Sequence, residues 1–260
     1  MNNSLHDDIG WQEELSRHSR EFEYATPQEI LRWALITFGD KLTMATAFGA
    51  EGCAIIAMLS QLRDETGIAP DVFNLDTGYQ FPETLALREE LIEKYQIPIR
   101  FVGAAQSVEE MEAEHNGPIY QHDPNLCCHI RKVVPLRDAL QGFSAYITAI
   151  RREQTPERAA SPIIGVDNKF AHIVKINPLA NWTRTQVWDF IAQNDVPTNP
   201  LHAQGFPSIG CWPCTRAVAD GEDERSGRWA GTDKRECGLH LGADGKLTRT
   251  SRPAKSLASF

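Results

Sequence analysis

Four of the six cysteines in this 260-residue chain occur as two close pairs. Cys127 and Cys128 are adjacent, and Cys211 and Cys214 are separated by two residues. Thiolates are soft ligands that suit zinc, copper(I) and iron–sulfur clusters. Adjacent helical residues project about 100° apart and serve one tetrahedral zinc ion poorly, whereas a cluster places each ligand on its own iron. The spacing favours one 4Fe-4S cluster on these four thiols; structural zinc and metal-free cysteines are the alternatives.

The remaining two cysteines have different surroundings. Cys237 lies in the run Lys-Arg-Glu-Cys-Gly-Leu-His, whose basic side chains can lower the pKa of a thiol. It is either an activated nucleophile on a mobile segment or a free surface thiol. Cys53 lies in the apolar run Cys-Ala-Ile-Ile-Ala-Met-Leu, which predicts a small buried residue without a chemical role.

Two polar turns follow apolar runs and are candidates for nucleotide contacts. The turn from Thr46 to Gly52, with Gly49 at its centre, leads into an apolar helix, so its backbone N–H groups could bind a phosphate. Asp76 and Thr77 stand in the turn Leu-Asp-Thr-Gly, where they could hydrogen-bond a ribose or a base. The alternative for the second turn is simply the end of a strand.

Three cations complete the candidate anion site. Arg151 and Arg152 directly follow an apolar run, and the guanidinium fork matches the geometry of a phosphate or sulfate. The alternative for this pair is a set of surface salt bridges. Lys132, four residues after Cys128, could place a positive charge near both a cluster and a bound anion.

The elements that position these residues alternate between strand and helix. Apolar runs predict strands at 42–48, 71–75, 97–102, 143–150 and 173–176, and amphipathic or capped segments predict helices at 11–24, 27–38, 53–62, 82–95, 107–115 and 183–191. This alternation predicts an α/β fold with a parallel sheet flanked by helices. Ligands of such sheets bind at the carboxyl ends of the strands, where the candidate turns fall.

The periodic pattern also suggests a domain organisation. We expect residues 1–25 to form an N-terminal helical extension and residues 26–240 to form a single domain. Within it, residues 199–240 are an irregular segment rich in Pro, Gly, Cys and charge, folded over the edge of the sheet. Residues 241–260 are expected to be a mobile basic tail.

Composition narrows the function classes. The chain has 26 Lys and Arg against 35 Asp and Glu, a net charge of −9, so a broad nucleic-acid surface is not expected, while a small anionic ligand needs only local cations. No apolar run approaches the roughly 18 residues of a membrane helix, and the first residues do not resemble a secretory signal. We therefore expect a cytoplasmic protein without structural disulfides.

Several of these motifs together resemble the assimilatory adenylyl-sulfate (APS) reductases, the iron–sulfur branch of the 3′-phosphoadenylyl-sulfate (PAPS) reductase family. The resemblance rests on the two cysteine pairs, the run from Pro197 to Arg228 and the segment Glu-Cys-Gly-Leu-His at 236–240. The runs 75–78, 151–154 and 175–182 are also similar to that family. The match covers about residues 26–240.

The resemblance implies both a fold and a reaction. It implies the adenine-nucleotide α-hydrolase-like fold and one 4Fe-4S cluster on the paired cysteines. Cys237 would attack the sulfur of APS, expel AMP and become an S-sulfocysteine, which thioredoxin or a glutaredoxin-like protein would reduce to release sulfite. Cations at the phosphosulfate would come from Lys132, Arg225, Arg228 and His240.

The sequence differs from the family pattern at two places and leaves alternatives open. The nucleotide turn reads Thr46-Ala-Phe, with fewer hydroxyl groups than the family has, and the linker between Arg228 and Cys237 is about two residues shorter. The alternatives are an enzyme that accepts PAPS, alone or with APS, and a non-catalytic iron–sulfur sensor that binds a nucleotide. A homo-oligomer is compatible with either.

Overall fold

A six-stranded sheet forms the centre of the protein in the computed structural model, which describes residues 9–170, 173–232, 234 and 236. The strand order is β3-β2-β1-β4-β6-β5. All neighbours pair in parallel except β5 and β6, which are antiparallel. The strands are β1 Leu42–Thr46, β2 Asp71–Asp76, β3 Ile99–Gly103, β4 Ala145–Ile147, β5 Ile164–Asp167 and β6 Ile173–Ile176.

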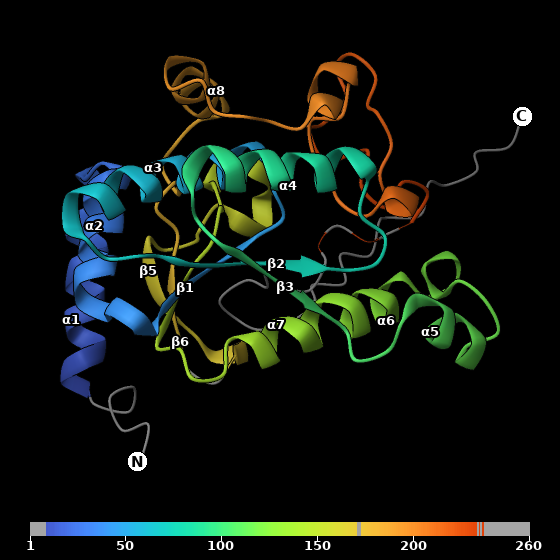
Figure 1. Ribbon diagram of the computed structural model, residues 1–260, viewed down its shortest axis with the longest axis horizontal. Coiled ribbons are helices and arrows are strands. Elements are labelled where there is room, and N and C mark those ends of the chain that lie inside the picture. The colour runs from blue at the N-terminus through green and yellow to red at the C-terminus, as the bar shows by residue number, and fades with distance from the viewer. Residues whose placement is uncertain (1–8, 171–172, 233, 235, 237–260) are drawn as a thin grey trace, which may run out of the picture.

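Helices cover both faces of this sheet. In Figure 1, α3 and α4 lie on one side of the strands, and α5, α6 and α7 lie on the other. The helices are α1 Ile9–Glu21, α2 Pro27–Phe38, α3 Ala50–Thr66, α4 Pro82–Tyr95, α5 Val108–Glu114, α6 Pro124–Cys128, α7 Val134–Ala139 and α8 Arg184–Gln193. Helix α1, inside the predicted N-terminal extension, packs beside β5. Among the described residues, no helix has the length and apolar character needed to cross a membrane.

The core has two layers because successive strand residues point to opposite faces. Val72 belongs to the larger apolar cluster, which includes α2, α3, α4 and α8, whereas its neighbour Phe73 belongs to the cluster beneath α7. Ile147 and Tyr146 divide between the clusters in the same way. The predicted α/β fold with a parallel sheet flanked by helices is confirmed.

The structure corrects several details of the predicted strands: β1 ends at Thr46 rather than at residue 48, and β3 spans Ile99–Gly103 rather than 97–102. The strand expected at 143–150 is limited to Ala145–Ile147, and the residues from Thr148 to Ile150 line a cavity instead. Strand β5 was not predicted; the apolar run that marks it is short, and only Ile164 of its four residues is fully buried. Strand β5 pairs on one side only, as the last strand of the sheet. Such a strand needs less apolar sequence than a central one.

Candidate active site

A short helix with an altered continuation presents the first cysteine pair. Helix α6 begins at Pro124 because the carboxylate of Asp123 accepts the N–H groups of Asn125 and Leu126, at 3.1 and 2.9 Å. After Cys128 the chain forms one π-helical turn, His129–Val133, before α7. Such turns recur at functional sites because they redirect the side chains that follow. Lys132 stands in this turn.

The four paired cysteines meet at one small pocket, which we call the cysteine pocket. Cys127 and Cys128 are buried at the end of α6; Cys211 precedes the short 3₁₀ turn Trp212–Cys214, and Cys214 ends it. No imidazole or carboxylate joins them among the described residues that line the pocket. Within this part of the chain, no three ligand-type side chains converge as they would around a single metal ion.

The thiols of this pocket differ in their electrostatic surroundings. Burial, with the neighbouring thiols, raises the pKa of Cys127 to about 12 and that of Cys214 to about 11. Burial also opposes ionisation of Cys211, yet Lys132, the Thr77 hydroxyl and Arg228 together lower its pKa below the usual thiol value. The Thr77 Oγ1 lies 3.3 Å from the Cys211 Sγ. Cys211 is thus a thiol at which these interactions outweigh the effect of burial.

Arg131, in the π-helical turn that follows α6, links this turn to the end of β2. Its side chain is only 5% exposed, and its guanidinium donates to the backbone carbonyl oxygens of Thr77 (2.8 Å) and Gln106 (2.6 Å). The turn after β2 needs Gly78, whose φ is +72° and whose position could not hold a Cβ beside Val108. The Leu-Asp-Thr-Gly turn therefore has a fixed place beside the cysteine pocket.

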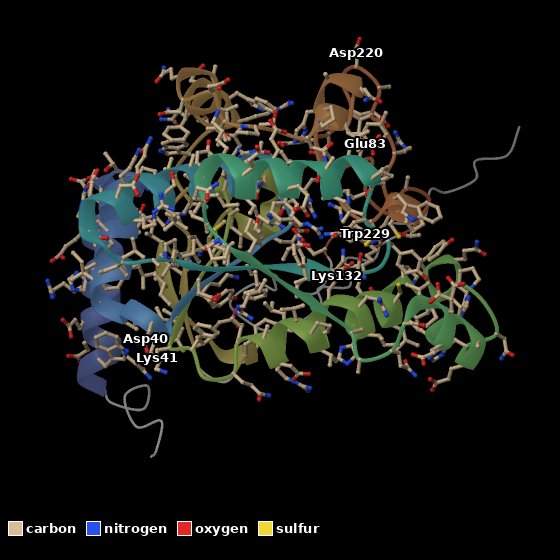
Figure 2. All side chains as sticks on the ribbon, viewed as in Figure 1. Asp40, Lys41, Glu83, Lys132, Asp220 and Trp229 are labelled. Carbon is tan, nitrogen blue, oxygen red and sulfur yellow. The ribbon has the colours of Figure 1, made fainter. Side chains whose placement is uncertain are left out.

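A second, larger cavity of about 220 Å³ opens at the carboxyl ends of the parallel strands, where the fold predicts a ligand site. We call it the main cavity. Its walls come from the ends of β1, β2 and β4, from the first turn of α3 and from residues 207–211 and 224–228. Lys132 and Cys211 line both the main cavity and the cysteine pocket, so the two spaces adjoin. Figure 2 shows Lys132 at the end of β2, between the cysteine helices and the C-terminal segment that carries Trp229.

The start of α3 forms one wall of the main cavity. Thr46 and Gly49 both line it, and the Thr46 hydroxyl accepts the N–H of Phe48 at 3.1 Å. Helix and strand approach closely here, because a Cβ at Gly52 would lie 2.7 Å from Thr46 Oγ1. The N–H groups of a first helical turn favour an anion. Glu51, in the same turn, is negatively charged and would repel a bound anion.

Four cations line the main cavity: Lys132, Arg158, Arg225 and Arg228. Arg228 is held over the ring of Trp229, 4.7 Å from its centroid, and donates to the carbonyl of Ile209 at 3.2 Å. The backbone N–H of Trp229 donates to the backbone carbonyl of Cys214 at 2.9 Å. The segment from 207 to 229 thus brings its cations and its cysteine pair to the sheet together.

The structure brings six of the sequence-predicted binding residues to the main cavity and leaves three outside its lining. The six are Lys132, Arg225, Arg228, Thr46, Gly49 and Thr77. Asp76 accepts the N–H of Gly78 at 2.9 Å, and so forms the turn itself. Cys237 and His240 lie outside the described residues.

Arg151 and Arg152 form ion pairs with carboxylates and do not line the main cavity. Arg151 is fully buried and contacts Glu51 at 2.8 Å, Glu153 at 3.2 Å and Glu224 at 3.4 Å. Arg152 points toward the N-terminal segment and pairs with Glu23 at 2.7 Å. The alternative of surface salt bridges thus describes Arg152, whereas the ion pairs of Arg151 are buried.

Sequence reasoning missed Arg158 and Glu236. Arg158 is 7% exposed and lines the main cavity from the 3₁₀ turn Pro156–Arg158. Its carboxylate partner is Glu236, the residue before Cys237. The available signal was a further Arg seven residues after Arg151, in a loop that follows a strand end.

Comparison with known proteins agrees with this geometry. Residues 41–217 match the phosphoadenosine phosphosulfate reductase domain. The chain is 44% identical to the phosphoadenosine 5′-phosphosulfate reductase of Gloeobacter violaceus, over 87% of this chain and 93% of that protein. It is 43% identical to the adenosine 5′-phosphosulfate reductase of Streptomyces coelicolor, over 86% of this chain and 92% of that one.

Among solved structures, one PAPS reductase and one more distant protein share this fold. The crystal structure of the PAPS reductase from Candida auris, a phosphate complex, is 33% identical, with a TM-score of 0.69 over 80% of this chain and 97% of that one. The FMN adenylyltransferase of Candida glabrata, 15% identical, shares the fold with a TM-score of 0.54 over 85% of this chain and 76% of that one. On these matches and on the cavity at its strand ends, the chain belongs to the phosphoadenosine phosphosulfate reductase family of enzymes.

Proposed function

We propose that this enzyme reduces adenylyl sulfate to sulfite and AMP in sulfate assimilation, in the cytoplasm, with thioredoxin or a glutaredoxin-like protein as the reductant. The observation that carries the proposal is the main cavity, which Lys132 and Arg228 line and which lies directly beside the cysteine pocket. The Nε of Arg228 and the Nε2 of His202 are buried there without a hydrogen-bond partner among the described residues. Buried polar groups of this kind favour a polar ligand.

Cys237 is the proposed nucleophile. Its thiolate attacks the sulfur of APS, a sulfur–sulfur bond forms, and the bond from sulfur to the bridging oxygen breaks. AMP leaves with the electron pair of that bond, and Lys132 and Arg228 stabilise its developing negative charge. A thiolate of the reductant then attacks the Cys237 sulfur and releases sulfite, and the second thiol of the reductant resolves the mixed disulfide.

The cysteine pocket fits an iron–sulfur cluster. Four thiols that line one pocket, with no imidazole or carboxylate among the described lining residues, are a donor set that suits a 4Fe-4S centre. Cys127, Cys128, Cys211 and Cys214 would hold it. When bound, the cluster would supply a fixed charge beside Lys132; the two electrons for sulfite come from the reductant's thiols.

The choice between APS and PAPS is the finer part of the proposal. Relatives with both names align at 43–44% identity, so the names alone do not separate the two substrates. We favour APS because the two cysteine pairs resemble the APS-type branch. Turnover of each nucleotide by the purified protein, measured as thioredoxin-dependent sulfite release, tests this. A higher kcat/KM for PAPS would reverse the assignment.

The same assay separates an enzyme from a sensor. The proposal predicts multiple turnovers of APS that need both thioredoxin and Cys237. A nucleotide sensor would bind AMP and release no sulfite. Iron and acid-labile sulfide, measured on anaerobically purified protein, would be present in equal amounts if the cysteine pocket holds the proposed cluster, and zinc without sulfide would contradict it.

A further inference from the structure

The residue before the proposed nucleophile is fixed at the wall of the main cavity. Glu236 has a side chain only 7% exposed, and it forms a two-pronged ion pair with Arg158, with Nε to Oε1 at 2.9 Å and Nη2 to Oε2 at 3.0 Å. Arg225 donates to the same carboxylate at 3.3 Å. Two of the four cations that line the cavity therefore hold a carboxylate of the protein itself.

Gln154, in the 3₁₀ turn Arg152–Gln154, supports the ion pair. The third nitrogen of Arg158, Nη1, donates to Gln154 Oε1 at 2.5 Å. Gln154 also accepts the Arg151 N–H at 3.1 Å and donates to Glu51 in the first turn of α3 at 3.0 Å. Each of the three Arg158 nitrogens donates to Glu236 or Gln154, so these contacts fix the guanidinium in an orientation that holds Glu236.

A second tether lies two residues earlier. Lys234 Nζ donates to the Pro124 carbonyl at 2.9 Å and to Asn125 Oδ1 at 2.8 Å, at the start of the cysteine helix α6. Lys234 and Glu236 therefore anchor the same short stretch of chain to both the cysteine helix and the cavity wall.

We propose that Glu236 is a positioning residue: its carboxylate docks between Arg158 and Arg225 and thereby sets where the next residue, Cys237, meets the nucleotide. The effect on catalysis rests on the proposed function of Cys237. The docking of Glu236 does not, because its ion pairs are formed by described residues. A buried two-pronged pair fixes both distance and orientation. Misplacement of a reacting group by about 1 Å costs on the order of 100-fold in rate.

The first test follows one turnover. APS is mixed with the enzyme without reductant, and the sulfonate adduct is followed by quenched-flow mass spectrometry. Glu236→Gln is expected to form the adduct about 100-fold more slowly, with unchanged affinity for AMP, and Glu236→Asp is expected to recover part of the rate. Glu222→Gln is the matched control, because Glu222 forms a two-pronged pair with Arg216 in the same segment on the exposed surface.

Two results of this test would overturn the proposal. One is an adduct rate for Glu236→Gln equal to that of Glu222→Gln. The other is a Glu236→Gln enzyme that binds AMP more tightly and reacts faster, which would make the carboxylate a competitor of the substrate. The unfolding temperature and iron content of both variants serve to exclude a general loss of structure.

The second test does not depend on turnover. Alkylation of Cys237 by iodoacetamide is timed by peptide mass mapping, in wild type, Glu236→Gln and Arg158→Gln. Undocking predicts a change of alkylation rate in the same direction in both variants. A purely electrostatic effect predicts opposite changes, because removing an anion lowers a thiol pKa and removing a cation raises it.

These two tests separate docking from catalysis. Opposite changes in alkylation, or none, would overturn the docking. A change in the same direction in both variants would support it even if APS formed no adduct on the wild-type enzyme, a result that would instead count against the proposed function.

Discussion

Gly210 controls the position of Arg228, and a single methyl group there tests whether Arg228 binds phosphate. An added Cβ would overlap the guanidinium of Arg228. The obstacle is the end of a flexible side chain, so Gly210→Ala is expected to fold normally and to move Arg228 away from its place. The backbone φ of Gly210 is not in the region that only glycine favours.

The size of the effect follows from the interaction that is lost. A hydrogen bond to a charged group contributes about 1.5–3 kcal/mol, and about 1.4 kcal/mol corresponds to a tenfold change in affinity. Gly210→Ala should therefore weaken AMP binding by about 10-fold to about 100-fold. Isothermal titration calorimetry measures this, and the unfolding temperature checks that the fold is unchanged.

Adenosine provides the control, because it lacks the phosphate. Its affinity should be the same for Gly210→Ala and for the wild type. Equal loss for AMP and adenosine would mean that the substitution distorts the whole cavity. An unchanged AMP affinity, with the fold intact, would refute the role assigned to Arg228.

Three further predictions concern stability. Gly227→Ala should lower the free energy of unfolding by about 1–3 kcal/mol in urea denaturation, because its Cβ would strike the backbone oxygen of Arg216, which cannot turn away; a neutral result would contradict this. Arg131→Met should lower the free energy of unfolding by at least about 2 kcal/mol, since it leaves the carbonyl groups of Thr77 and Gln106 unpaired. A decrease no larger than that of an exposed Arg variant would argue against a structural role for these two hydrogen bonds. The hydrogen bond from Arg152 is the main cause that lowers the pKa of Glu23 from 4.5 to about 2. The pair therefore stabilises the fold above pH 4.5, and this contribution disappears as the pH falls toward 2. Glu23→Gln should flatten that part of the stability–pH curve, and an unchanged curve would show that the pair is not formed.

Local sequence patterns predicted the positions of most core elements. Helix α4 has the bounds predicted from its apolar spacing and from Pro82 at its first position. Helices α2, α5 and α8 begin at capping boxes that can be read directly from the sequence. These signals are local, so they do not depend on knowing the partner elements.

The candidate site was less predictable because it depends on long-range pairs. Arg151 and Arg228 look equally suited to an anion in the sequence, yet Arg151 is enclosed by three carboxylates, one of them 73 residues away. Arg158 and Glu236 are 78 residues apart, and neither belongs to a motif that signals the other. Which arginine meets a carboxylate and which lines a cavity is decided by packing.

The measurement that tests the account most directly is the mass of the intact protein after incubation with APS in the absence of any reductant. The account predicts a mass increase of one sulfonate group, mapped by peptide analysis to Cys237, and its loss on addition of reduced thioredoxin with release of sulfite. Cys237→Ser should remain unmodified. An adduct on any other residue, or sulfite release by Cys237→Ser at the wild-type rate, would contradict the central claim.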